Sequence, residues 1–514
     1  MWVEEGVWHD VRLLEGAAQL FETRTYVRNR AAFGSEWSPG IDNDPRVTIL
    51  HATSLGEDIL GYTSSLDEYP KSTFPQSNEA EMITVNLETV EIGTPSYDAL
   101  LAREFAHLIQ CNLDRNEERW VKEGLTELAA VLNGFDPDNL RQAYLQSPDV
   151  PFAPWTDATN QRGAALLFLS HFHQRFGDEG TRLLTAEPGN GVRGFESVLD
   201  KLGAQLTFDG LVTDWLATTY LDSVSEDKGS RYAYERFDLN RPEPSAFYDA
   251  YPAETHTTVH QLGADYVVLQ GSGDIHIRFA GQKETSLLGG VSLGIKPIWW
   301  SNRADESLTS LTARFDLRGL QKAALSYRAW YDIEPRYDYV TVEISTDGGS
   351  RWHELPVPSG ANANPCGSSP VWGYTGKSDG WVKEVIDISE YAGASILVRF
   401  RYVTDAAITG EGLLLDDVTI TGGDPAQAVE IEVDEWKSDG FILTDGRVQQ
   451  DFVVLLIGMG QEIFVERLPL DGDQSAEWDV PLKSRDLQEA VLVVTAIAPA
   501  THQPASYRLI VDQD

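Results

Sequence analysis

The sequence contains very little cysteine and methionine. Its 514 residues include 2 Cys and 3 Met. The two cysteines, Cys111 and Cys366, lie in parts of the chain that we assign below to different domains. We therefore exclude the disulfide framework that stabilises many small secreted domains. The cysteine content by itself does not decide the cellular compartment.

Positive charge is also scarce. Lys and Arg number 40 against 80 Asp and Glu, which gives a formal net charge of −40. Such a surface repels a phosphate backbone, so we expect no nucleic-acid partner. The excess carboxylates would keep a secreted protein soluble, and they offer the oxygen ligands that calcium prefers.

Long apolar runs are missing as well. Uncharged stretches such as 452–460 and 490–500 are much shorter than the roughly 20 residues of a membrane helix, so we expect no membrane span. The first residues, Met1 to Glu5, lack the basic and apolar regions of a secretory signal. This start fits either a cytosolic protein or the mature form of a secreted one.

The composition is that of packed globular domains. Hydrophobic residues make up 42% and charged residues 23% of the chain, which excludes disorder and coiled coil. At about 100 to 200 residues per domain, the length predicts three or four domains.

The first part of the chain mixes helical and strand patterns. Thr94 and Pro95 form a helix start, because threonine caps the first turn and proline lacks only an amide that the turn does not use. Another helical pattern stops at Gly177, which suits a helix end. The predicted helices are 95–111, 118–132 and 161–176, and the predicted strands are 47–50 and 82–87.

After a polar, proline-containing stretch at 225–252 the hydrophobic period changes from 3.6 to 2. Alternation at 325–331, 340–344 and 396–402 predicts strands with one buried face, and Asp347-Gly348-Gly349 predicts a hairpin turn. We therefore predict a multidomain protein with an α+β domain followed by a β-sandwich and a small C-terminal β domain. The predicted boundaries are 1–225, a linker with a small β element at 226–289, the sandwich at 290–424 and the last domain at 425–514.

Residues 101–110 and 118–128 hold the parts of a metal site. A zinc protease needs two imidazoles at i and i+4, a glutamate beside the first, and a third ligand from a second helix. Glu104 stands at the general-base position, His107 is the second imidazole, and Glu123 is the ligand on the next helix. Arg103 stands where the first histidine is expected.

This arrangement resembles the glutamate-ligand zinc metallopeptidases, the gluzincins, and more widely the secreted bacterial proteases of the immune inhibitor A type. Further blocks of resemblance extend over most of residues 30–424. These blocks are 33–36, 42–46, 299–305, 331–334, 345–352 and 414–418. The resemblance implies that the first domain is zincin-like and that the sandwich is a jelly-roll module similar to receptor MAM domains.

The resemblance implies a zinc site with Glu104 as base and His107 and Glu123 as ligands. Two residues depart from the family pattern: Arg103 replaces a histidine, and Lys122 replaces the usual asparagine before Glu-Gly. Because a guanidinium stays protonated and has no lone pair to donate, Arg103 cannot bind zinc. Two protein ligands are too few for a catalytic zinc, which uses three.

Three interpretations of these helices remain open. The residues are ordinary helix side chains, or His107, Cys111, Glu123 and Glu127 line a shifted zinc site, or Arg103 replaces the metal by pairing with Glu123. In each case we expect the helix 95–111 to bury Leu101, Phe105 and Leu108. We also expect Gly124 to let the two helices approach each other closely.

The predicted sandwich contains a second candidate metal site. The resemblance implies that acids at strand ends gather around a structural calcium, and the candidates are Asp305, Glu334, Asp338 and Asp417. A solvated acidic rim is the alternative, since a chain with 80 carboxylates places several near one another by chance.

The resemblance therefore indicates an extracellular zinc-metallopeptidase-family protein, acting on extracellular proteins or peptides, with an impaired or lost zinc site. The alternative is a non-catalytic pseudopeptidase that binds protein or glycan through its cleft and jelly-roll domain.

Overall fold

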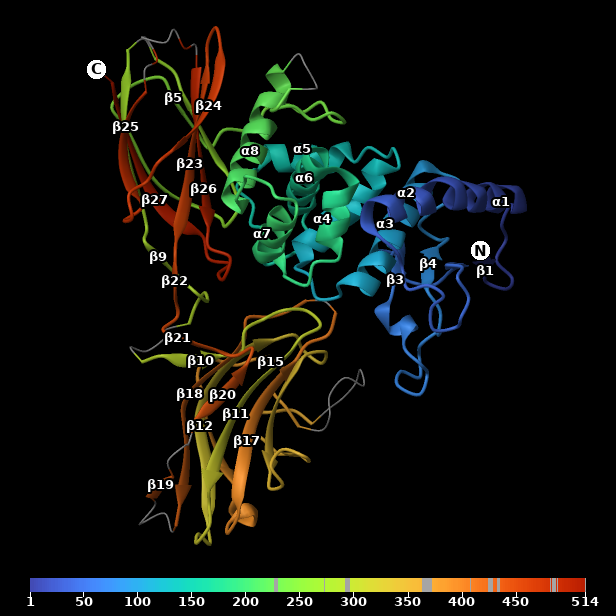
Figure 1. Cartoon of the computed structure of the whole chain (residues 1–514), viewed down its shortest axis with the longest axis vertical. Coiled ribbons are helices and arrows are strands. Elements are labelled where there is room, and N and C mark those ends of the chain that lie inside the picture. The colour runs from blue at the N-terminus through green and yellow to red at the C-terminus, as the bar shows by residue number, and fades with distance from the viewer. Residues whose placement is uncertain are drawn as a thin grey trace. The chain divides into compact units, whose positions relative to one another are not determined.

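The computed structural model describes residues 1–513 apart from 226–229, 272, 292–295, 363–371, 407, 424–428, 432–434, 481, 483–486 and 488. Cys366 lies outside the described residues. The chain divides into two compact units, Met1–Thr285 with Val448–Asp514, and Ser286–Arg447. It passes from one unit to the other near strands β9 (Glu284–Ser286) and β22 (Arg447–Gln449) (Figure 1).

The first unit begins with a small mixed sheet in the order β1-β2-β4-β3. Strands β1 and β4 run parallel to β2, and β3 runs antiparallel to β4. The two strands predicted from sequence, β2 and β4, are present within two residues of the predicted bounds. The strands are β1 (Trp2–Val3), β2 (Thr48–Ala52), β3 (Gly61–Thr63) and β4 (Met82–Asn86).

Helices form most of the rest of residues 1–225. The predicted helix start is confirmed, because the Thr94 hydroxyl accepts the amide hydrogen of Tyr97 at 3.3 Å. The helices are α1 (Val11–Leu20), α2 (Tyr26–Phe33), α3 (Pro95–Leu113), α4 (Arg119–Leu132), α5 (Asp138–Gln146), α6 (Thr159–Thr185), α7 (Gly191–Lys201) and α8 (Phe208–Leu221). Short helical turns occupy Phe21–Thr25, Ser65–Glu68, Asp222–Val224 and Ser389–Tyr391.

The predicted helix end at Gly177 is a kink inside α6. Gly177 has φ 66° and ψ −164°, a conformation that glycine adopts without the steric penalty of a Cβ. A further helical segment follows it directly, up to Thr185.

An aromatic cluster fixes α4 against α6 and α8. The ring centroids of Trp120 and Phe168 lie 5.7 Å apart, and those of Phe168 and Trp215 lie 5.3 Å apart. All three side chains are at most 2% exposed, and each such ring pair contributes about 1 kcal/mol beyond its buried area. The cluster holds the helix that carries Glu123 and Glu127 in a single orientation.

The same unit ends in a β-sandwich whose strands come from two distant parts of the sequence. Its sheets have the orders β24-β23-β26-β7-β5 and β25-β8-β27-β6. The first group of strands is β5 (Ala246–Tyr248), β6 (Ala253–Val259), β7 (Asp265–Leu269) and β8 (Ile275–Gly281). The second group is β23 (Asp451–Met459), β24 (Ile463–Leu468), β25 (Ser475–Val480), β26 (Glu489–Ile497) and β27 (Ala505–Gln513).

This pairing corrects the predicted division into a segment 226–289 and a separate domain 425–514. The hydrophobic period of 2 identified the strands, but it carries no information about which distant strand each one pairs with.

The sandwich of the first unit also contacts the helices of that unit. Tyr266 of β7 donates its hydroxyl hydrogen to the carbonyl of Leu216 on α8, and every residue of β7 is buried.

The second unit is a two-sheet β-sandwich, as predicted. One sheet has the order β15-β12-β18-β10-β21, with β16 on β12 and β19 on β18, and the other has the order β14-β13-β17-β11-β20. The strands are β10 (Ile298–Trp300), β11 (Leu308–Asp316), β12 (Ala323–Ile333), β13 (Tyr339–Ser345), β14 (His353–Glu354), β15 (Gly376–Lys377), β16 (Val382–Asp387), β17 (Ser395–Val403), β18 (Gly412–Gly422), β19 (Val429–Ile431), β20 (Trp436–Asp439) and β21 (Ile442–Thr444).

The sandwich extends beyond its predicted end at residue 424. Trp436 of β20 packs against Phe315 and Phe400 of the core, with ring centroids 6.1 and 6.3 Å away. Its strand pairs with β11 in antiparallel register.

None of the described helices combines the length and hydropathy needed to cross a membrane.

Candidate functional site

Helix α3 buries one side and leaves most of the predicted site on the other. Leu101 is 2% exposed and Phe105 fully buried, as the sequence predicted. Arg103 and His107, one turn apart on the opposite side, are partly exposed. Glu104 is 9% exposed, so the carboxylate at the general-base position is more enclosed than its neighbours.

Gly124 does allow a close helix approach, but the neighbour is α6. A Cβ at Gly124 would lie 2.8 Å from Cδ2 of Leu169 and 3.0 Å from the carbonyl oxygen of Ala165. The predicted approach of α4 to α3 at this glycine is therefore wrong. The helical period identified the position but gave no information on which of two neighbouring helices it faces.

Arg103 pairs with Glu127 instead of the predicted Glu123. Its Nε and one terminal nitrogen lie 2.9 and 2.8 Å from Oε2 of Glu127, whose side chain is fully buried. The other carboxylate oxygen of Glu127 is bound by Arg162 of α6. One buried carboxylate on α4 thus joins α3 and α6 through two guanidinium groups, and such charge-assisted bonds are the stronger kind.

Glu123 pairs within its own helix. Its Oε1 lies 2.9 Å from Nε of Arg119, one turn earlier on α4. Burial by itself would raise the pKa of Glu123, but the positive charges of His107, Arg119 and Arg162, with that of Lys122, together lower it. Glu123 is therefore ionised at neutral pH and faces cationic groups.

The pKa of Glu104 shifts in the opposite direction, upward. Burial raises the pKa of its carboxyl group, and the negative charge of Glu123 adds to this rise, while His107 and Arg103 act against it. The charge of His107 therefore acts on both Glu104 and Glu123. The three predicted site residues are close enough for electrostatic interaction.

The residues of this helical site do not fit a catalytic zinc. Arg103 has no lone pair to donate, and Glu127 already binds two arginines. Among the described residues, a single group of three or more His, Cys, Asp or Glu side chains brings its ligand atoms within 4.8 Å of one another, and it lies in the second unit. The structure does not bring the ligand atoms of the shifted set with Cys111 together either.

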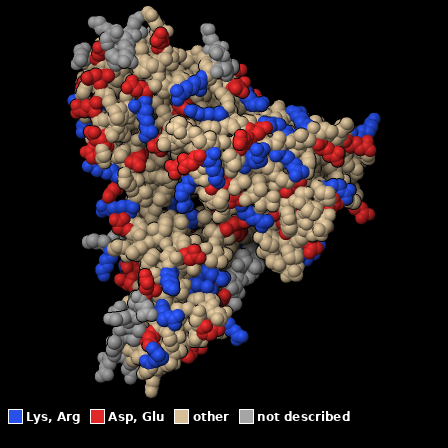
Figure 2. Space-filling view, in the orientation of Figure 1, with Lys and Arg blue, Asp and Glu red and all other residues tan. Residues whose placement is uncertain are grey.

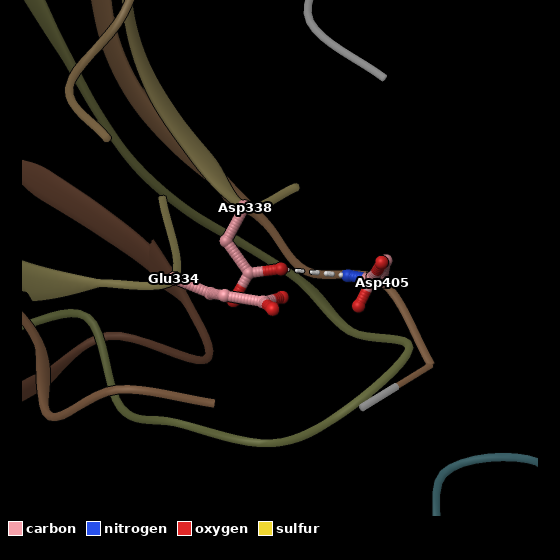
Figure 3. A group of neighbouring side chains, drawn as sticks. All are labelled: Glu334, Asp338 and Asp405. Atoms are coloured by element: carbon pink, nitrogen blue, oxygen red, sulfur yellow. Dashed lines mark hydrogen bonds between the residues drawn. The ribbon is translucent and has the colours of Figure 1, made fainter. Parts of the chain in front are cut away.

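That group consists of Glu334, Asp338 and Asp405 (Figure 3). Glu334 follows strand β12, Asp338 precedes β13, and Asp405 follows β17. The backbone amide of Asp405 donates to the Asp338 carboxylate at 2.9 Å, and Tyr402 donates its hydroxyl hydrogen to the same carboxylate at 3.4 Å. One carboxylate oxygen of Glu334 is buried and accepts no hydrogen bond.

The electrostatics of this group favour a cation. Burial raises the pKa of Asp338 to about 8, with further contributions from the charges of Asp405, Glu334 and Asp305. Burial also raises the pKa of Glu334 to about 7, again with Asp405 and Asp305 contributing. A bound cation would relieve this repulsion, and an all-oxygen set suits calcium.

The sequence predicted this site in part. Glu334 and Asp338 lie in the group, and Asp305 acts on both through its charge. Asp417 does not belong to it, because it lies on β18 and pairs with Arg328 at 3.4 Å. Asp405 was missed, although it lies three residues after the predicted strand 396–402, the same strand-end signal that identified the other acids.

Outside these sites, acidic and basic side chains are interspersed over the visible surface (Figure 2). Many of them form exposed pairs, such as Arg46 with Asp44 and Arg318 with Asp316. Exposed pairs of this kind add little stability, about 0–1 kcal/mol each.

Comparison with known proteins identifies the second unit. Residues 293–446 match the family model described as the MAM domain of immune inhibitor A-like proteins. This range includes strands β20 and β21, which the sequence analysis had placed beyond the sandwich.

Three relatives share domain-length similarity with the chain. The pre-pro-metalloprotease PrtV of Vibrio cholerae is 31% identical over 134 residues, 25% of this chain and 14% of PrtV. Immune inhibitor A of Bacillus thuringiensis is 29% identical over 154 residues, 29% of this chain and 21% of its own length. Bacillopeptidase F of Bacillus subtilis is 28% identical over 106 residues, 21% of this chain and 6% of its own length.

The alignments thus span at most about a fifth of each relative. Among solved structures, that of the infectious bursal disease virus Gx strain aligns over 51% of this chain and 40% of its own at 9% identity. Its TM-score of 0.11 is too low to support any argument about the fold.

Proposed function

We propose that this chain, whose residues 293–446 match the MAM domain of immune inhibitor A-like proteins, is an extracellular peptidase-family protein that has lost its catalytic zinc site. It would recognise extracellular proteins or peptides without cleaving them. The relatives named as a metalloprotease and a bacillopeptidase support the peptidase ancestry.

One observation carries the proposal. Arg103, which the sequence resemblance aligns with a zinc-binding histidine, is bound to the buried carboxylate of Glu127. A protonated guanidinium cannot ligate a metal, and its removal from a buried pair would leave an uncompensated charge. His107 and Glu123 remain as two ligands where catalytic zinc sites use three.

The test is metal analysis of the purified full chain and of R103H. After incubation with zinc and dialysis against zinc-free buffer, the parent should retain much less than one zinc per chain. It should also not cleave a denatured protein substrate. R103H restores the imidazole pair at i and i+4 and should bind zinc at least ten-fold more tightly.

R103K is the matched control, because lysine keeps the positive charge without adding an imidazole. It should bind no more zinc than the parent. One tightly held zinc per parent chain, together with proteolysis that a chelator abolishes, would refute the proposal.

We propose in addition that the MAM domain holds a structural calcium between Glu334, Asp338 and Asp405. The support is their convergence at the ends of three strands and the buried, unpartnered oxygen of Glu334. Calcium would neutralise acids that repel one another and so stabilise the loops that carry them. Isothermal titration of the chelator-treated full chain with calcium tests this directly.

A further inference from the structure

Two connections between helices of the first unit contact each other. Residues 114–118 join α3 to α4, and residues 186–190 join α6 to α7. The backbone amide of Gly191, the first residue of α7, donates to Oε1 of Glu117 at 2.7 Å. The amide of Glu118 donates to the same oxygen, so hydrogen bonds use both of its lone pairs.

The other oxygen of Glu117 and one oxygen of Asp114 are buried without a partner. Asp114 is 8% exposed and Glu117 is 4% exposed. Within the described part of the chain, Oδ2 of Asp114 and Oε2 of Glu117 have no hydrogen-bond donor. Burial of such an oxygen without a partner is costly. Both oxygens therefore indicate a ligand that the described side chains do not supply.

The two acids also act on each other. Burial raises the pKa of Glu117 to about 8, and the charges of Glu118 and Asp114 add to this rise. Burial also raises the pKa of Asp114, with a contribution from the charge of Glu187. The carboxyl groups of Asp114 and Glu117 are therefore close enough to repel each other, and a cation between them would favour the ionised form of both.

The nearby lysines do not fill this position. The ammonium group of Lys122 acts against the raised pKa of Asp114 through its charge, but it donates to the carbonyl of Arg115 at 3.0 Å. Lys201 is bound to Glu187. Neither lysine donates to the two unpartnered oxygens.

A main-chain carbonyl lies beside the unpartnered oxygen of Glu117. A Cβ added to Gly194 on α7 would lie 2.2 Å from the carbonyl oxygen of Gly189 and 3.6 Å from Oε2 of Glu117. Both oxygens therefore border the space that the missing side chain leaves. Carboxylate and carbonyl oxygens together are the ligands that calcium takes in proteins.

We propose that the first unit binds a calcium ion through Oδ2 of Asp114, Oε2 of Glu117 and the carbonyl oxygen of Gly189. Water completes the coordination shell of about six to eight oxygens. The ion replaces the proton that Glu117 otherwise keeps and ends the repulsion between the two acids. Because residues 114–118 lead directly into α4, the ion also fixes the start of the helix that carries Glu123. The site uses no zinc ligand, so it is independent of the proposed loss of the catalytic metal.

Isothermal titration of calcium into the full-length D338N variant, in zinc-free buffer at pH 8, tests the proposal. D338N removes a ligand of the calcium site proposed for the MAM domain, so the remaining binding reports on the first unit. D338N should bind one calcium per chain. D338N/E117Q should bind it at least ten-fold more weakly, because glutamine keeps the shape of glutamate without its charge. D338N/E179Q is the matched control, since Glu179 is an exposed glutamate on α6, and it should bind calcium as D338N does.

The unsubstituted chain gives a second comparison that does not depend on the MAM domain. The parent should bind one calcium ion more than E117Q and one more than D114N. Thermal melting shows whether each variant is folded, and E117Q should remain folded because Glu117 is itself neutral without calcium. No calcium binding by D338N, equal affinities of D338N and D338N/E117Q, or an equal loss in D338N/E179Q would overturn the proposal. Zinc analysis of the same samples tests the proposed function separately.

Discussion

Arg103 on α3 and Glu127 on α4 form an ion pair in which two guanidinium nitrogens contact one carboxylate oxygen. Arg162 completes the arrangement from α6. A single buried carboxylate therefore holds three helices together at the site.

Replacing Glu127 with alanine should destabilise the first unit by about 2–3 kcal/mol. The usual loss on breaking a buried pair is about 3–5 kcal/mol, and the partial exposure of both arginines reduces it because water can solvate them. Urea unfolding followed by tryptophan fluorescence measures the change. E179A on α6 is the control, since Glu179 is exposed and should change the stability by less than about 0.5 kcal/mol. Equal effects of the two variants would contradict the structural role of Glu127.

Glu117 should make the stability of the first unit depend on pH. Burial raises the pKa of Glu117 to about 8 from an ordinary value of 4.5, and one of its carboxylate oxygens is buried without a partner. The folded state therefore keeps a proton that the unfolded state releases, so this contribution to stability is full below pH 4.5 and is lost as the pH rises to about 8.

The variant E117Q tests this sign. Glutamine stays neutral at every pH, so the variant should be more stable than the parent at pH 8 and should lose less stability between pH 5 and 8. Urea unfolding at several pH values measures both curves, with E179Q as the control. Parallel curves for E117Q and the parent would contradict the assignment.

Calcium removal should lower the melting temperature of the second unit. The variant D338N should abolish the calcium-dependent part of this shift, because it removes a carboxylate from the centre of the acidic group. D417N should leave it intact, since Asp417 pairs with Arg328. Differential scanning calorimetry of the full chain, with and without chelator, distinguishes the two variants. A calcium shift that survives D338N would contradict the assigned ligand set.

Substituting Gly124 with alanine should destabilise the chain by about 1–3 kcal/mol, the usual penalty for overpacking. The added Cβ would approach the backbone carbonyl of Ala165 to 3.0 Å, and a backbone atom cannot move aside as a flexible side chain can. G16A is the control, because Gly16 also lies inside a helix, α1, and has no neighbouring atom within 4 Å of the added Cβ. It should not destabilise the chain, and an equal loss of stability in G16A and G124A would contradict the overpacking argument.

The sequence predicted local structure better than tertiary pairing. The cap at Thr94, the helix 118–132 and the strands of the second unit depend on neighbouring residues, and each is present within a few residues. The partner of β7, in contrast, is β26, more than 200 residues later in the chain. No local pattern encodes that choice, which depends on which apolar faces remain to be covered.

The side-chain pairing in the helical site could not be predicted from local patterns either. Helical spacing correctly placed Arg103 and His107 on one face of α3. It could not decide between Glu123 and Glu127 as the partner of Arg103, because both lie on the same face of α4, one turn apart. The choice depends on Arg162, which approaches Glu127 from a third helix.

The interrupted sandwich of the first unit has a consequence for the order of synthesis. Strands β7 and β8 leave the ribosome before the MAM domain, whereas their partners β26 and β27 follow it. The MAM domain can therefore fold while the earlier strands still lack partners. During that interval β7, buried on both faces in the finished protein, would expose apolar surface. Such a chain depends on late, long-range strand pairing, which is slow and prone to aggregation.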